Sequence, residues 1–138
     1  MEESSNARMV SIMKLIIAGS RKFTANYYYH YIDIYINEVI GADNVKMVLC
    51  GEAKGIDTHG KKWALKNNIE VKSYPADWDK HGKLAGPLRN KEMASQATHL
   101  LLVWDGKSKG SKNMLNEAEK AGLIIHNIDL NHLPNNPN

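Results

Sequence analysis

Short apolar runs alternate with longer amphipathic segments along the chain. The runs favour β-strands by their aliphatic and β-branched side chains, and they lie at residues 13–18, 45–50, 69–74, 99–104 and 124–128. The segments between them have helical length and lie at residues 24–40, 57–68, 87–97 and 111–121. Gly41 and Gly122 are placed to end the first and last of these helices. The pattern therefore predicts five strands, each followed by a helix except the last.

Two of the expected strands are apolar almost throughout. Leu15, Ile16 and Ile17 form the centre of the first strand, and residues 100–103 form most of the fourth. Strands buried on both faces are typical of a parallel sheet covered by helices. The sequence therefore predicts an α/β fold, a doubly wound parallel sheet of about five strands with helices on both faces. Ligands of such folds bind beyond the carboxyl ends of the strands, where the strand order reverses, so the strand-to-helix loops are the expected site.

Length and composition indicate a single domain. The chain has 138 residues, of which 43% are hydrophobic and 24% charged, enough to form a core. We expect a flexible leader at residues 1–12, one domain at residues 13–129 and a frayed tail at residues 130–138. No apolar run approaches the ~20 residues of a membrane helix, and the leader lacks the pattern of a signal peptide. With Cys50 as the one cysteine, an internal disulfide is excluded, and we expect a cytoplasmic protein with no membrane partner.

The first expected helix is unusually rich in tyrosine. Five of its residues follow the i, i+3, i+4 spacing of a buried helix face and are predicted to lie in the core: Tyr28, Tyr31, Ile32, Tyr35 and Val39. Tyr27 and Tyr29 are predicted to point elsewhere. The simpler interpretation is amphipathic packing, and the alternative is a subunit interface or a stacking surface, which leaves a homo-oligomer possible.

The first two strand-to-helix loops combine glycine with polar side chains. Gly19, Ser20 and Arg21 follow the first strand, where a tight turn would direct amides, a hydroxyl and a guanidinium toward a ligand. The second loop contributes Gly51, Glu52, Lys54, Gly55 and Asp57. Asp57 is expected to cap the helix that follows. The Glu52 carboxylate would repel a phosphate, which leaves a role in sugar binding or acid–base chemistry open.

The third and fourth loops carry the remaining candidates. Residues 75–90 form a long loop with Asp77 and Trp78, and Arg89 and Asn90 follow in the first turn of the next helix. Trp78 either stacks on a ligand or plugs the loop. The fourth loop offers a phosphate cradle formed by Asp105, Gly106, Ser108, Gly110 and Ser111. It lacks the spacing of a Walker motif, which argues against a P-loop NTPase.

Charge supports an anionic ligand at these loops. The net charge is only +3, yet residues 19–24, 51–57, 75–91 and 105–112 hold ten Lys or Arg against five Asp or Glu. The rest of the chain holds eight against ten. This concentration favours a phosphorylated small molecule, although solvated lysines could produce the same balance by chance.

Metal and covalent chemistry have no support in the sequence. The six histidines show no pair at metal-ligand spacing, so no metal site is predicted. Cys50 reads as a small buried hydrophobe rather than a nucleophile, and no serine lies in a Gly-x-Ser-x-Gly turn.

Five blocks along the chain resemble the SLOG superfamily, in particular its small stand-alone YspA- and YpsA-related type. The blocks cover residues 17–23, 51–57, 75–78, 82–94 and 104–111. The resemblance implies a Rossmann-like sheet with a site for a nucleotide or an NAD-derived ligand, formed by the loops described above, and no obligatory cofactor.

A distant branch of this superfamily, the LOG phosphoribohydrolases, cleaves N-glycosidic bonds with an arginine and a glutamate. The resemblance places Arg89 at the arginine. The branch's Pro-Gly-Gly-x-Gly-Thr-x-x-Glu motif corresponds to residues 105–114, where Gly110 and Ser111 match Gly-Thr but Met114 replaces the glutamate. Glu52 or Glu117 would have to substitute for it. Glu52 also replaces the second glycine that is usual in the small family.

Three functions follow from these observations. The leading hypothesis is binding of a signalling nucleotide or of an NAD or ADP-ribose-type metabolite, as a sensor or a sponge. The alternative is an N-glycosidase for nucleoside monophosphates or ADP-ribosyl compounds, with Arg89 and Glu52 as its catalytic candidates. The third is single-stranded DNA binding, as in the DprA branch of the superfamily, with Trp78 and the tyrosine helix as stacking surfaces. The modest net charge makes nucleic acid the least favoured partner.

Overall fold

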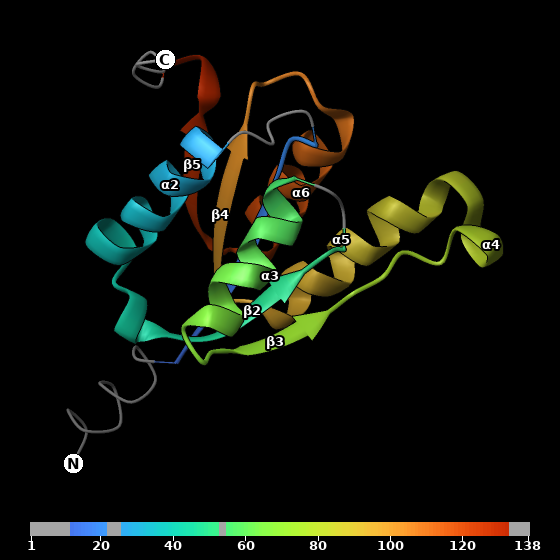
Figure 1. The fold of residues 1–138 in the computed structure, drawn as a ribbon. Helices are drawn as coiled ribbons and strands as arrows, with labels where there is room; N and C mark the ends of the chain where they lie inside the picture. Colours follow the sequence, from blue (N-terminus) through green and yellow to red (C-terminus); the bar gives the residue numbers. More distant parts are fainter. Residues whose placement is uncertain (1–11, 22–25, 53–54, 133–138) are drawn as a thin grey trace.

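The chain forms one five-stranded sheet in which all neighbouring strands are parallel (Figure 1). The computed structural model describes residues 12–21, 26–52 and 55–132. The strands are β1 (Met13–Gly19), β2 (Val45–Cys50), β3 (Glu70–Ser73), β4 (His99–Trp104) and β5 (Ile124–Asp129). Their order is β3-β2-β1-β4-β5, so the five predicted strands are confirmed, and the order reverses between β1 and β4.

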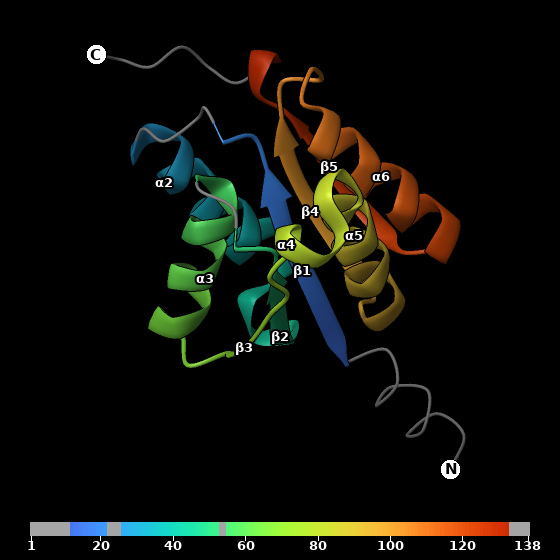
Figure 2. The ribbon, with the colours of Figure 1, turned by 90° about the vertical axis from the view of Figure 1, so that its right-hand side faces the viewer.

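Within the described residues, four α-helices longer than a single turn connect these strands and cover both faces of the sheet. They are α2 (Asn26–Tyr35), α3 (Ile56–Lys66), α5 (Ala85–Gln96) and α6 (Lys109–Ala121). Figure 2 shows α2 and α3 on one face and α5 and α6 on the other. The Rossmann-like, doubly wound fold is therefore confirmed. None of the described helices combines the length and the apolar character that crossing a membrane requires.

The central strand β1 shows why the sheet is stable. Leu15 and Ile17 pack into the cluster under α2 and α3, whereas Ile16 and Ala18 pack into the cluster under α5 and α6. Leu15, Ile16 and Ile17 are fully buried. Burial of the apolar run on both faces is the feature that the sequence indicated.

The tyrosine helix differs from its predicted face assignment. Helix α2 gives way to a π-helical turn at Ile36–Ile40, which rotates the last residues relative to an α-helix. Ile36 follows the buried Ile32 by one α-helical turn and is buried as well. After the change of period, Ile40 is buried and Val39 is 58% exposed rather than in the core. Tyr29 packs on the core and stacks on His59 with ring centroids 4.3 Å apart, so its predicted outward direction is also wrong.

The three tyrosines assigned to the core face follow the prediction more closely. Tyr28, Tyr31 and Tyr35 are half-buried against the cluster under α2 and α3. Tyr27 makes an edge contact with Tyr28 at 5.4 Å between ring centroids. The expected start of this helix at residue 24 lies outside the described residues.

Several helix starts also differ from the sequence prediction. The long loop after β3 contains a short helix, α4 (Trp78–His81), and a 3-10 turn at Gly82–Leu84. Helix α5 therefore begins two residues before the predicted Pro87. The N-cap of α3 is Gly55 and not Asp57, which lies inside the first turn. Gly41 and Gly122 have φ values of 88° and 76° and end their helices as predicted.

Candidate functional site

A cavity of about 350 Å³ opens where the strand order reverses, beyond the carboxyl ends of β1 and β4. We call it the main cavity. The two strands stay paired up to Gly19 and Val103, and the chain then leaves them toward opposite faces of the sheet, where α2 and α6 lie. Of the residues predicted from the sequence, those that line it are Gly19, Arg21, Asp57, Trp78, Arg89, Asn90, Ser108, Gly110 and Ser111.

Sequence reasoning did not select the other residues of the lining. They are Ala18, Lys83, Gly86, Pro87, Met93, Lys109, Asn113 and Met114. Met93, Asn113 and Met114 lie one helical turn beyond the predicted residues Asn90 and Gly110, so helical spacing was the available signal. Met93 and Met114 are also buried in the core, which makes one part of the cavity wall apolar.

Charge in the main cavity is predominantly positive. The basic side chains of its lining are those of Arg21, Lys83, Arg89 and Lys109. Asp57 is the one acidic residue among the described lining residues. This arrangement suits an anion whose charge exceeds one.

The N-terminus of α6 adds backbone donors to this positive field. Ser108 is the N-cap, and its hydroxyl accepts a hydrogen bond from the Ser111 amide at 3.3 Å. The amide of Lys112 donates to the Ser108 carbonyl at 3.0 Å. The first amides of the helix, at Lys109 and Gly110, therefore remain without an intrahelical partner. Such a helix end attracts phosphate through these amides and through the helix dipole.

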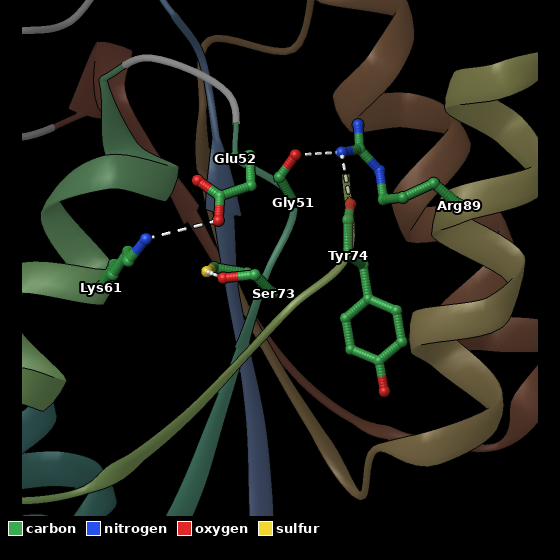
Figure 3. Close-up of polar contacts among 7 residues, drawn as sticks. Gly51, Glu52, Lys61, Ser73, Tyr74 and Arg89 are labelled. Atoms are coloured by element: carbon green, nitrogen blue, oxygen red, sulfur yellow. Dashed lines mark hydrogen bonds and ion pairs between the residues drawn. The ribbon is translucent and has the colours of Figure 1, made fainter. Parts of the chain in front are cut away.

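Arg89 is held at the edge of the main cavity by three acceptors, of which Figure 3 shows the carbonyl oxygens of Gly51 and Tyr74. Its Nη1 donates to the carbonyl oxygens of Gly51 and Tyr74, and its Nε donates to Asn90 Oδ1 at 2.9 Å. Burial lowers the pKa of the guanidinium, the nearby Asp57 carboxylate raises it, and the Arg21 cation lowers it. An arginine keeps its charge despite such shifts, so Arg89 presents a fixed cation to the cavity.

Asp57 lies beside Arg89 and is 5% exposed. Its Oδ1 accepts a hydrogen bond from the Gly19 amide at 3.3 Å. A Cβ placed on Gly51 would lie 2.6 Å from Arg89 Nη1 and 3.1 Å from Asp57 Oδ2, which shows how near the two charges are to one another. The carboxylate thus ties the first turn of α3 to the end of β1 instead of capping its own helix.

Glu52 lies outside the main cavity. It lines a smaller cavity of about 180 Å³, the side cavity, together with Arg21, Gly51, Pro75, Ala76, Trp78 and Arg89. Its Oε1 is 3.4 Å from Lys61 Nζ, and its backbone has a φ of 65°, which is rare for a residue other than glycine. A hydrogen bond from Ser73 and the Lys61 ammonium lower the pKa of the carboxyl, while burial raises it. Glu52 is therefore an ionised acceptor at neutral pH.

The remaining predicted residues have local roles or lie elsewhere. Ser20 is buried, its amide donates to Val103 O at 3.1 Å, and its hydroxyl has no hydrogen-bond partner among the described residues. Asp77 caps α4, and Asp105 accepts a hydrogen bond from the amide of Lys107.

Gly55, Gly106 and Lys54 are the last of the predicted site residues. Gly55 lines a third cavity between α2 and α3, and Gly106 has a φ of 83° at its turn. Lys54 lies outside the described residues. In the described part of the chain no group of three or more His, Cys, Asp or Glu side chains could hold a metal ion.

Met114 stands at the position that corresponds to the glutamate of the phosphoribohydrolase motif, and its surroundings are apolar. Met114 is buried and forms part of the main-cavity wall. Glu117, one turn further along α6, is paired with Lys120 at 4.0 Å and is not part of that wall. Neither Glu117 nor Glu52 therefore places a carboxylate where the motif would have one.

The chain is similar to known proteins in sequence and in fold. A family model described as the YspA, cpYpsA-related SLOG family matches residues 13–81. The Gene 61 protein of Mycobacterium phage D29 is 36% identical over 88 residues, which cover 59% of this chain and 70% of that protein. Among solved structures, DNA processing protein A (DprA) from Streptococcus pneumoniae is similar with a TM-score of 0.67 at 18% identity, over 85% of this chain. The chain spans about half the length of DprA, so this likeness concerns the fold.

Proposed function

The chain belongs to the YspA, cpYpsA-related SLOG family, and from this premise we propose that it binds a phosphorylated, nucleotide-derived small molecule in the main cavity, as a sensor or a sponge. Membership of this family supports nucleotide-related binding in general. The cavity chemistry supports a small molecule that carries phosphate.

One observation carries the proposal: the N-terminus of α6 and four basic side chains surround the main cavity. Helix amides and guanidinium groups are the usual partners of phosphate in proteins. Met93 and Met114 add an apolar wall, and Trp78, which is 53% exposed, adds an aromatic face. A polar anchor beside apolar and aromatic surface is what a nucleotide with its phosphate and base requires.

The three residues that the two cavities share favour a ligand of the NAD or ADP-ribose type. Arg21, Trp78 and Arg89 line both the main cavity and the side cavity. A ligand with a second sugar beyond its phosphates could therefore extend from one cavity into the other. The ionised Glu52 would accept hydrogen bonds from the hydroxyls of that sugar.

An N-glycosidase is the second candidate because Asp57 places a carboxylate beside Arg89 in the main cavity. It is less favoured than binding alone, since Asp57 accepts from the Gly19 amide and Met114 occupies the glutamate position. Single-stranded DNA binding rests on the exposed Trp78 beside basic side chains and would show a steep loss of affinity with salt.

Calorimetry with ADP-ribose, NAD, ADP and AMP tests the proposal, with a short single-stranded oligonucleotide as comparison. The informative variant is R21A/K109A, which removes two cations of the main-cavity lining. The matched control is K112A/K120A, which removes two exposed lysines of α6 outside that lining. We expect the first variant to bind at least about tenfold more weakly than wild type and the control to bind normally.

Mass analysis of the recovered ligand then separates the candidates. An intact ligand supports a sensor or sponge, and free base or free nicotinamide establishes the glycosidase instead. The proposal fails if no phosphorylated probe binds, or if R21A/K109A binds as tightly as K112A/K120A.

A further inference from the structure

A chain of side-chain hydrogen bonds joins α5 to α6 at the wall of the main cavity. Arg89 Nε donates to Asn90 Oδ1 at 2.9 Å, and Asn90 Nδ2 donates to Asn113 Oδ1 at 2.9 Å. Asn90 Nδ2 also lies 3.4 Å from the Gly110 carbonyl oxygen. Asn90 is 6% exposed, so water has little access to the middle of this chain.

The direction of these hydrogen bonds is fixed by chemistry. A guanidinium can only donate, so the side of Asn90 that faces Arg89 must be its oxygen. The amide nitrogen of Asn90 then faces Asn113 and the Gly110 carbonyl, both of which accept. Asn113 therefore turns its oxygen toward Asn90, and the polar group that it has left is its NH2.

The position of Asn113 places that NH2 at the anion-binding end of α6. Asn113 lies one turn into the helix and belongs to the main-cavity lining. Helical side chains lean toward the N-terminus of their helix, here the segment with the unpaired amides of Lys109 and Gly110. The backbone amides of Lys109 and Gly110 and the side-chain NH2 of Asn113 can thus donate hydrogen bonds to the same region of the cavity.

We propose that Asn113 is a ligand-binding residue that donates from Nδ2 to a phosphoryl oxygen, with its orientation set by Arg89 acting through Asn90. The inference rests on the proposed function and adds a specificity to it. The group of the ligand beside Asn113 must accept a hydrogen bond, because an ammonium group at this point would meet two donor hydrogens. Arg89 is here a positioning residue, because it orients the Asn113 amide through Asn90, and it also contributes its positive charge to the cavity.

The variant N113D tests this assignment with little change of shape. An aspartate still accepts from Asn90 Nδ2, so the chain of hydrogen bonds persists, but its second oxygen replaces the NH2 and repels phosphate. The matched control is N116D, an equal change of charge at an exposed asparagine on the same helix. With ADP and with inorganic phosphate as probes, we expect N113D to bind at least about tenfold more weakly than wild type and N116D to bind within about twofold of it.

Nuclear magnetic resonance of the wild-type protein gives a second readout that does not depend on how the variant folds. The side-chain NH2 resonances of Asn113 should shift on titration with ADP, whereas those of Asn116 should stay unchanged. If ADP binds wild type but N113D behaves like N116D, and the Asn113 resonances do not move, the assignment of Asn113 is wrong while the proposed function stands. If neither probe nor any other nucleotide binds wild type, both fail.

Discussion

Two helical glycines, Gly60 in α3 and Gly110 in α6, should respond in opposite ways to the same substitution by alanine. A Cβ on Gly60 would lie 2.6 Å from Cγ2 and 2.7 Å from Cβ of Ile17, on the central strand. A Cβ on Gly110 would meet nothing within 4 Å. The two changes have equal chemistry and differ only in the space that receives the methyl group.

The size of the effect follows from this geometry. An ordinary contact begins at 3.4 Å, so Gly60→Ala requires α3 and β1 to separate by about 0.8 Å at this point. Ile17 is fully buried and its strand is paired on both sides, so it cannot retreat cheaply. Overpacking costs about 1–3 kcal/mol, and two clashing atoms on a buried strand put Gly60→Ala in the upper part of that range, at about 2–3 kcal/mol. The helix gains about 1 kcal/mol from losing a glycine. We therefore expect a net loss of about 1–2 kcal/mol for G60A.

For G110A the methyl group is unopposed, and the unfolding free energy should stay equal or rise by up to about 1 kcal/mol. Urea unfolding followed by circular dichroism measures both variants against wild type. Thermal unfolding should show G60A lower by several degrees, since about 1 kcal/mol corresponds to roughly 3–5 °C at this chain length. Equal stability of G60A and G110A, or a more stable G60A, would refute the reasoning from packing.

Two further predictions concern the site and the pH dependence of stability. Gly51→Ala places a Cβ 2.6 Å from Arg89 Nη1 and should displace that side chain. We expect a folded protein whose affinity for ADP-ribose, measured by calorimetry, falls about tenfold. Normal affinity would contradict this prediction. Burial lowers the pKa of the His126 and His99 rings, and His126 lowers that of His99 further. The unfolded chain then binds more protons below about pH 6.5, so the urea midpoint should fall as the pH drops from 7.5 to 5.5. His126→Gln should flatten this decline, and an unchanged slope would contradict it.

The fold was predictable because its strongest signal is local. Leu15, Ile16 and Ile17 are apolar in sequence and buried on alternate faces in space, which a parallel sheet between two helical layers requires. The π-helical turn at Ile36–Ile40 escaped the same reasoning because a periodicity analysis assumes one constant helical period. Val39 was placed on the wrong face for this reason.

The residues of the candidate site that lie in the strand-to-helix loops and at the helix starts were predictable from the sequence, whereas those further along the helices were missed. Strand ends identify Gly19, Arg21 and Ser108 because the carboxyl edge of a parallel sheet is where ligands bind. Asn113 and Met114 reach the same cavity from inside α6, and which side of a helix faces the cavity depends on how that helix crosses the sheet. Helical spacing from Gly110 indicates these two positions, but the crossing itself is set by packing between elements far apart in sequence.

The central place of β1 also governs the order in which the sheet can be completed during synthesis. One edge of β1 pairs with β2, but the other awaits β4, and Lys14 exchanges hydrogen bonds with Thr98, 84 residues later. Until β4 leaves the ribosome, the nascent sheet ends in a strand that is apolar at most of its positions, with open backbone groups along its length. A long sequence separation of this kind slows folding, because the chain loses the entropy of closing the loop before the stabilising contacts between the two strands form. The strand at the centre of the finished sheet is thus an open edge of the growing one, where it can pair with a neighbouring chain on the polysome.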